Sequence, residues 1–326
     1  MENLPEIYNL KDLIDHIIES KIADDDKKYD LVIKGIEQNP KIVEDISDLS
    51  KLSEFIVNQL QIKDDSCKRY LAIAIIKENP DIIKDFDDSS KLSDFIVDKL
   101  NIADDFYKRD LAIAIIENNP NIINNSKELS TFIKALGIKY DSYKRDLTIA
   151  IIKENPDIIK DFDDSSKLSE FIVDELQIVD DSRKRDLAIA IIKQNRDIIK
   201  DSKDLSKFIA KLQFTNNFYK TDLVIKIIED KPEILGNNKE EGLSECIKEF
   251  GYLYQPDLIC DLLQKLQQTV AISFKELNKH LYHNDHLKER FFLKAMGQGI
   301  INKDDFLECG FKEIKTNDIY LGSRQL

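Results

Sequence analysis

Apolar residues recur along this chain with helical spacing, in short segments that repeat. In residues 106–118, four apolar side chains share one face of a 3.6-residue period: Leu111, Ala112, Ile115 and Ile116. Ile113 and Ala114 flank this face, and the Asp104-Asp105 pair before the segment supplies an N-cap carboxylate. So wide an apolar face predicts a helix that contacts one helix before it and another after it.

An Asn-Pro step ends this helix, because proline cannot donate to the helical ladder and restricts the residue before it. The same step can begin a short helix, for example Pro80 to Phe86, which a polar Asp-Asp-Ser-Ser loop follows. A third helix is then predicted from apolar residues at i, i+3, i+4 and i+8: Leu92, Phe95, Ile96 and Leu100.

These segments belong to a tandem repeat. Ser66 to Ile102 returns at Ser142 to Ile178, 76 residues later, with 31 of 37 positions identical. Asn-Pro steps mark a half-period at Asn39, Asn79, Asn119 and Asn155, with degenerate copies at Asn195-Arg196 and Lys231-Pro232. The successive spacings are 40, 40, 36, 40 and 36 residues. Most of the residues that the short copies lack are missing from the loop, and one is missing near the end of the third helix.

The period predicts an all-α, right-handed α-solenoid of about six helical repeats. The repeats fill residues 1–236 and end near Pro40, Pro80, Pro120, Pro156, Arg196 and Pro232. In period and helix number, though not in consensus residues, the array is similar to HEAT and armadillo repeats. Residues 237–326 are predicted as a helical C-terminal cap, with helices near 256–268, 273–282, 287–296 and 304–309. The alternative for this region is a small effector or binding module.

Composition narrows the functional classes. The net charge is −14, which disfavours a sequence-independent nucleic-acid binder and steers the chain toward basic partners. The four cysteines, Cys67, Cys246, Cys260 and Cys309, form no Cys-x-x-Cys pair and indicate free thiols in a reducing compartment. Without a signal-peptide pattern or a long apolar run, the expected location is the cytoplasm, although export by a non-classical route stays open.

Candidate chemistry is sparse. No phosphate-binding loop, dinucleotide fingerprint or nucleophile motif occurs, and we predict no enzyme activity and no cofactor. One histidine cluster, His280, His283 and His286, is a weak zinc candidate, since three ligands would need a turn at Asn284-Asp285 and a further donor. A polar helix-turn-helix surface is the preferred interpretation.

One repeated feature breaks a local rule. In every repeat a lysine lies in the first turn of the helix that ends at the Asn-Pro step or its degenerate copy, at Lys28, Lys68, Lys108, Lys144, Lys184 and Lys220. Arginine follows the central four lysines, at Arg69, Arg109, Arg145 and Arg185. Basic groups in a first helical turn oppose the helix dipole. Either they pair with Asp-rich loops of an adjacent repeat, or they form a basic ladder that meets an acidic peptide or a phosphate backbone. We predict the four Lys-Arg pairs from Lys68-Arg69 to Lys184-Arg185 as partner-binding candidates.

The function predicted from these features is a non-enzymatic protein–protein interaction scaffold with an extended charged surface. The lack of tryptophan and scarcity of methionine favour a polar, charge-guided interface with a protein or peptide partner. The alternative is RNA or polyanion binding through the Lys/Arg ladder, although nucleic acid is not the expected partner. A more distant alternative is metal-dependent activity in the C-terminal region.

Overall fold

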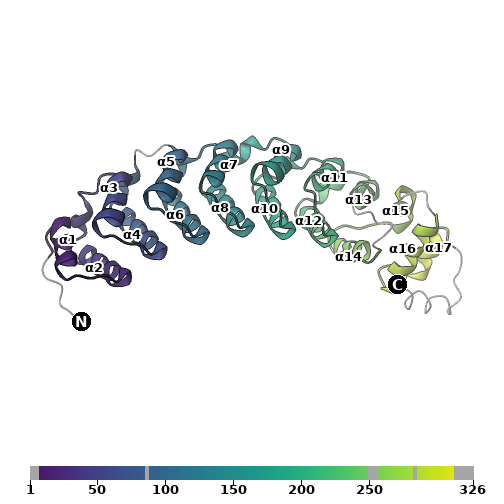
Figure 1. The fold of residues 1–326 in the computed structure, drawn as a ribbon. Coiled ribbons are helices and arrows are strands. Elements are labelled where there is room, and N and C mark those ends of the chain that lie inside the picture. The colour runs from purple at the N-terminus through teal and green to yellow at the C-terminus, as the bar shows by residue number, and fades with distance from the viewer. Residues whose placement is uncertain (1–6, 85–87, 249–255, 282–284, 312–326) are drawn as a thin grey trace. The chain divides into compact units, whose positions relative to one another are not determined.

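The computed structural model describes residues 7–84, 88–248, 256–281 and 285–311, and in these segments helices and turns occur without any strand (Figure 1). This confirms the predicted all-α repeat solenoid. The chain divides into two compact units, Met1–Asp161 and Phe162–Leu326. Among the described helices, none is both long and apolar enough to cross a bilayer.

The first unit stacks helical hairpins in two layers (Figure 1). Its helices are α1 (Leu10–Glu19), α2 (Asp25–Gln38), α3 (Leu49–Ser53), α4 (Asp65–Glu78), α5 (Ser89–Asp94), α6 (Asp105–Asn118), α7 (Ser126–Ala135) and α8 (Asp141–Glu154). The even-numbered helices form one layer, the even layer, and the odd-numbered helices form the other, the odd layer. In the even layer α4 packs between α2 and α6, and α6 packs against α8. Leu111 and Ile115 of α6 are fully buried, while Ile113 and Ala114 are half-buried. The wide apolar face therefore contacts two neighbours, as predicted.

Within the second unit the helices have the same two-layer arrangement. Its helices are α9 (Ser165–Glu170), α10 (Asp181–Gln194), α11 (Ser202–Lys211), α12 (Asn217–Asp230), α13 (Lys239–Lys248), α14 (Pro256–Leu266), α15 (Phe274–His280), α16 (Asp285–Gly297) and α17 (Lys303–Glu308). Helix α12 packs against α10 and α14, and α13 packs against α11 and α15. Gly236, near the predicted domain boundary, lies inside this unit at a turn with φ of +72°.

The Asn-Pro steps begin short 3₁₀ turns: η1 (Pro40–Val43), η3 (Pro80–Ile83), η5 (Pro120–Ile122) and η6 (Pro156–Asp161), with η8 (Arg196–Ile198) and η9 (Pro232–Leu235) at the degenerate copies. The helix predicted for Pro80 to Phe86 is shorter than expected, since η3 ends at Ile83 and residues 85–87 lie outside the described segments. Asn79 Nδ2 donates to the carbonyl oxygens of Val43 and Ile46 at 3.0 Å. The step thus ends one helix and ties its repeat to the preceding one.

The long repeats insert their extra residue as a π-helical turn. Helices α3, α5 and α9 continue into η2 (Glu54–Gln59), η4 (Phe95–Lys99) and η7 (Phe171–Glu175). There the Leu100 amide donates to the Phe95 carbonyl, five residues back, at 2.8 Å. In the short repeat the Leu136 amide donates to Phe132, four residues back, at 3.0 Å. Both leucines are fully buried, so the π turn absorbs one residue while returning leucine to the core.

Candidate interaction surface

The repeated lysines form internal contacts that we call Lys–Asp clips. Five of the six lysines lie near the aspartate three residues before them, as in Lys68 Nζ to Asp65 Oδ1 at 3.4 Å, whereas Asn217 stands at that position for Lys220. The Lys68 ammonium also donates to the Asn101 carbonyl at 3.1 Å, and Asp65 Oδ2 accepts from the Ala103 and Asp104 amides at 2.7 and 3.0 Å. One clip therefore joins the start of an even-layer helix to the loop that precedes the next one.

The clip recurs in both units. In the first, Lys28 Nζ donates to the Leu60 carbonyl at 2.8 Å. In the second, Lys184 Nζ donates to the Gln213 carbonyl at 3.2 Å, while Asp181 accepts from the Thr215 amide at 2.8 Å. The corresponding loop for Lys220 includes residues 249–255, which lie outside the described segments.

The clips resolve the apparent conflict with the helix dipole. Asn101 and Gln213 have positive φ values of 52° and 51° and follow the C-terminal ends of odd-layer helices, where a positive charge is favourable. Each lysine thus opposes the dipole of its own helix but complements that of a neighbour. Lys68 and Lys184 are only 5% exposed, so their cations contribute little to the surface.

The arginines form a second network, the Arg–Asp ladder. In the first unit, Arg69 Nη1 donates to Asp110 Oδ2 at 2.8 Å, and Arg109 Nε and Nη2 donate to Asp110 Oδ1 at 3.0 and 2.6 Å. Arg109 Nη1 also lies 3.4 Å from Asp146 Oδ2, and Arg145 Nη2 donates to Asp146 Oδ1 at 2.6 Å. Arginines and aspartates therefore alternate across α4, α6 and α8. The arginines pair with aspartates of the helices and not with those of the Asp-rich loops.

The second unit holds a shorter copy of this ladder. Arg185 donates to Asp186 Oδ1 from Nε and Nη2 at 3.0 and 2.6 Å, and from Nη1 to Asp222 Oδ2 at 3.1 Å. Although burial opposes the charged form, the hydrogen bond to Asp186 and the charges of Asp186 and Asp222 raise the pKa of Arg185 above its ordinary value. The guanidinium is thus held by two carboxylates from successive even-layer helices.

Aromatic side chains line the same edge of the first unit and form what we call the aromatic row. Its members are Tyr29, Tyr70, Phe106, Tyr107, Tyr140 and Tyr143. Tyr70, Phe106 and Tyr140 are 47%, 37% and 65% exposed. Ring centroids lie 5.9 Å apart for Tyr29 and Tyr70 and 6.1 Å apart for Phe106 and Tyr143.

Guanidinium groups of the ladder connect the rings of the row. The Arg69 guanidinium carbon lies 3.7 Å from the Tyr70 centroid and 5.5 Å from that of Tyr107, and so bridges α4 and α6. Arg109 lies 4.6 Å from Phe106 and 4.8 Å from Tyr143. Such cation–π contacts, combined with hydrogen bonds to aspartate, hold both partners in fixed orientations.

The second unit repeats this combination at the same helix positions. Phe218 is 53% exposed at the start of α12 and lies 5.4 Å from Tyr219, which in turn lies 5.2 Å from the Arg185 guanidinium carbon. Val179, two residues before Asp181, is 78% exposed. Large exposed apolar side chains therefore gather at the beginnings of even-layer helices in both units.

The sequence-based predictions name the basic residues at these positions and omit the aromatic ones. Tyr107, Tyr143 and Tyr219 each precede a repeated lysine directly, a register that the sequence displays. Tyr70 and Phe106 stand at other positions in their repeats, so only stacking of the repeats brings them beside those tyrosines. The structure places Arg69 and Arg109 along the row. Lys68, Lys108 and Lys184 are buried, whereas Lys144 is half-buried.

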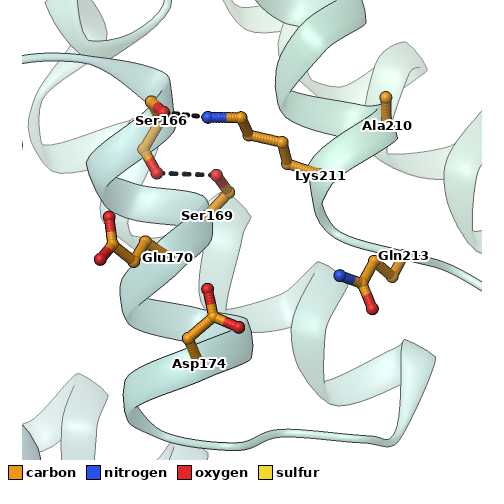
Figure 2. Close-up of a pocket in the computed structure, with 7 residues that line it drawn as sticks. All are labelled: Ser166, Ser169, Glu170, Asp174, Ala210, Lys211 and Gln213. Carbon is orange, nitrogen blue, oxygen red and sulfur yellow. Dashed lines mark hydrogen bonds between the residues drawn. The ribbon is translucent and has the colours of Figure 1, made fainter.

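A separate polar cavity of about 230 Å³ lies between α9 and α11 of the second unit (Figure 2). The Lys211 side chain reaches across it to the hydroxyl of Ser166, and Ser169 Oγ donates to the Ser166 carbonyl at 2.8 Å. Glu170 and Asp174 stand on the same side with exposed carboxylates. The cavity is thus lined by one cation, Lys211, and two carboxylates, as is usual for a solvated groove between two helices.

The zinc candidates are only partly described. His280 ends α15, with Nε2 3.5 Å from Asn238 Nδ2, His286 belongs to α16, and His283 lies outside the described residues. Within the described segments, no three or more histidine, cysteine, aspartate or glutamate side chains are grouped so that they could hold a metal ion.

Cys67, Cys260 and Cys309 are not activated nucleophiles. Burial, with hydrogen bonds to Asp26 and Asp64, raises the pKa of Cys67 to about 12, and burial raises the pKa of Cys260 to about 12 as well. The pKa of Cys309 is raised to about 11 by the same cause. Thiols with such pKa values stay protonated near neutral pH.

Comparisons with protein-family models, curated proteins and solved structures found no match for the chain.

Proposed function

We propose that this chain is a non-enzymatic protein-interaction scaffold and that the aromatic row is its contact surface. The observation that carries the proposal is the clustering of exposed aromatic side chains with oriented arginines at the starts of successive even-layer helices. Tyrosine and arginine are enriched in the energetically dominant centres of protein interfaces. Side chains already fixed by neighbours lose little entropy when a partner binds.

The surface continues along the even-layer helices. Ile73, Ile113 and Ile149 are half-buried at equivalent positions of α4, α6 and α8, one turn after the first-turn arginines. They add apolar area beside the row without replacing core contacts. A partner that lies across the repeats would meet aromatic and aliphatic side chains repeated from one helix to the next.

The bonding of the arginines favours a protein partner over a polyanion. Arg69, Arg109 and Arg145 all donate to aspartates of the ladder, so a phosphate would have to compete with carboxylates already in place. Exposed carboxylates of Asp64 and Asp104 cap α4 and α6, that of Asp24 caps the neighbouring α2, and all three repel phosphate. RNA or polyanion binding is therefore the second candidate, and it requires those ion pairs to open.

A photo-crosslinking experiment tests the proposal. A benzoylphenylalanine placed at Phe106 should crosslink a small, reproducible set of proteins in extracts of the cells that make this chain. The matched control carries the same group at Lys153, whose side chain is 75% exposed on α8. Excess unlabelled protein should compete for the products at position 106. Equal products at both positions, or crosslinks to nucleic acid in place of protein, would contradict the proposal.

A further inference from the structure

The chemistry of the aromatic row points to a particular class of partner, provided that the proposed function holds. The row offers aromatic faces and tyrosine hydroxyl groups, and its arginines already carry hydrogen bonds to aspartates. Tyrosines of the row supply donors suited to backbone carbonyl groups. A partner should therefore present apolar side chains together with unpaired carbonyl oxygens.

The spacing of the row suggests the conformation of that partner. Helices packed side by side have axes about 8–10 Å apart, and α2, α4, α6 and α8 pack in this way. A polyproline II helix completes one turn in three residues, or about 9 Å. One face of such a helix would meet one repeat per turn. Its carbonyl groups have no internal hydrogen bonds and are free to accept from tyrosine.

The charge along the row indicates the rest of the partner's chemistry. Asp24, Asp64 and Asp104 place exposed carboxylates at the starts of α2, α4 and α6. Each uses one oxygen to cap its helix, Asp64 accepting from the Cys67 amide at 2.9 Å and Asp104 from the Phe106 amide at 2.8 Å. With Asp26 these carboxylates outnumber the exposed Lys27 and Lys63 at the same helix starts and form an acidic rim, which favours a partner carrying lysine or arginine.

We propose that the aromatic row and its acidic rim bind a proline-rich segment with basic residues, in the polyproline II conformation. The prolines and aliphatic side chains pack on Tyr70, Phe106 and Tyr140, while the basic residues lie against Asp64 and Asp104. The aromatic rings and the carboxylates lie on the same edge of one unit, and together they select for one partner.

Peptide binding to the full chain provides the first test. The probe is a fluorescein-labelled peptide that repeats Pro-Pro-Leu and has arginine at each end. The control peptide replaces each proline by glycine or serine and keeps the leucines and arginines. Fluorescence anisotropy should show at least tenfold tighter binding of the proline peptide, because its bound conformation is already populated. Equal affinity for the two peptides would overturn the proposal.

Two variants separate the aromatic from the acidic contribution. The triple variant Tyr70→Ser, Phe106→Ser, Tyr140→Ser should bind the probe at least tenfold more weakly, and Ile18→Ser with Leu307→Ser removes exposed apolar side chains elsewhere as its control. The triple variant Asp24→Asn, Asp64→Asn, Asp104→Asn keeps good N-cap residues, so it should fold normally. It should bind severalfold more weakly, with a flatter salt dependence. Unchanged binding in both triple variants would refute the assigned site.

Failure of this inference is distinguishable from failure of the proposed function. If the proline peptide does not bind but Phe106 crosslinking to proteins is lost in the Tyr70→Ser, Tyr140→Ser background, the row is an interaction surface for a partner of other chemistry. If single-stranded RNA binds more tightly than the proline peptide at physiological salt, both proposals are wrong.

Discussion

Asp110 of α6 accepts a hydrogen bond from Arg69 of α4 across 2.8 Å, and the same carboxylate is held by Arg109 of its own helix. The substitution Asp110→Asn should lower the free energy of unfolding by about 1.5–3 kcal/mol, the range for hydrogen bonds to charged groups. Asp81→Asn is the matched control, because the Asp81–Lys84 pair is more than 70% exposed on both sides. Its effect should stay within about 0.5 kcal/mol. Urea denaturation measures both, and equal losses would show that the ladder does not stabilise the stack.

The Lys184–Asp181 clip should stabilise the fold more than the Asp110 contact does, since both of its side chains are only 6% exposed. Lys184→Met leaves the Asp181 carboxylate buried without its cation and the Gln213 carbonyl without its donor, so a loss of about 3–5 kcal/mol is expected. Lys153→Met, at a side chain that is 75% exposed, provides the control. A melting temperature for Lys184→Met that matches the control would contradict the clip.

Deletion of Asp98 tests the π-helical turn. This exposed residue lies within η4, and removing it should convert the turn to the geometry that Phe132 and Leu136 already show in the short repeat. The protein should stay folded, with a modest change in melting temperature. Deleting Ile113 from α6 instead rotates Ile115 and Ile116 off the buried face, so the circular dichroism signal should fall sharply. Equal damage from both deletions would count against a tolerated extra residue.

Gly242 of α13 has no room for a side chain. A Cβ atom there would lie 2.5 Å from the carbonyl oxygen of Leu235, so backbone would have to move. Gly242→Ala should destabilise the second unit by about 1–3 kcal/mol, as overpacking does. Gly297→Ala, at the end of α16 where nothing lies within 4 Å, should be neutral or slightly stabilising. Thermal denaturation measures the melting temperature of both variants. An equal fall in melting temperature for Gly242→Ala and Gly297→Ala would contradict the close contact at Gly242.

The buried thiols predict loss of stability at high pH. The folded pKa values of Cys67 and Cys260, about 12, exceed the ordinary value of 9.0. The folded state therefore retains a proton that the unfolded state releases, and its contribution is complete below pH 9 and declines as the pH rises toward 12. Cys67→Ser or Cys260→Ala should reduce this decline. At pH 8 Cys67 and Cys260 should react slowly with a thiol reagent until denaturant is added, and fast labelling of either one in the native state would disprove its burial.

The sequence by itself determined the repeat and most of the helices, although the helix predicted for Pro80 to Phe86 is the shorter turn η3 and α13 was not predicted. Helical apolar spacing, N-cap aspartates and Asn-Pro steps are local signals, because each acts within one or two turns of its own position. Asp104 caps α6 and Asn119 ends it, as predicted. Even the one-residue difference between long and short third helices is visible in the sequence, although its form as a π turn is not.

Tertiary structure alone decided what the charged and aromatic residues contact. Lys231 stands where the other repeats have asparagine, yet its ammonium donates to the Ile199 carbonyl at 3.0 Å, as the Asn155 amide does to Ile123 at 2.8 Å. Lys68 meets a carbonyl 33 residues away, and Arg69 meets an aspartate 41 residues away. Composition and spacing cannot give such pairings, because they depend on how one repeat is rotated and shifted against the next. The same stacking brings Tyr70 to Arg69 and the rings of α6, and so creates the aromatic row.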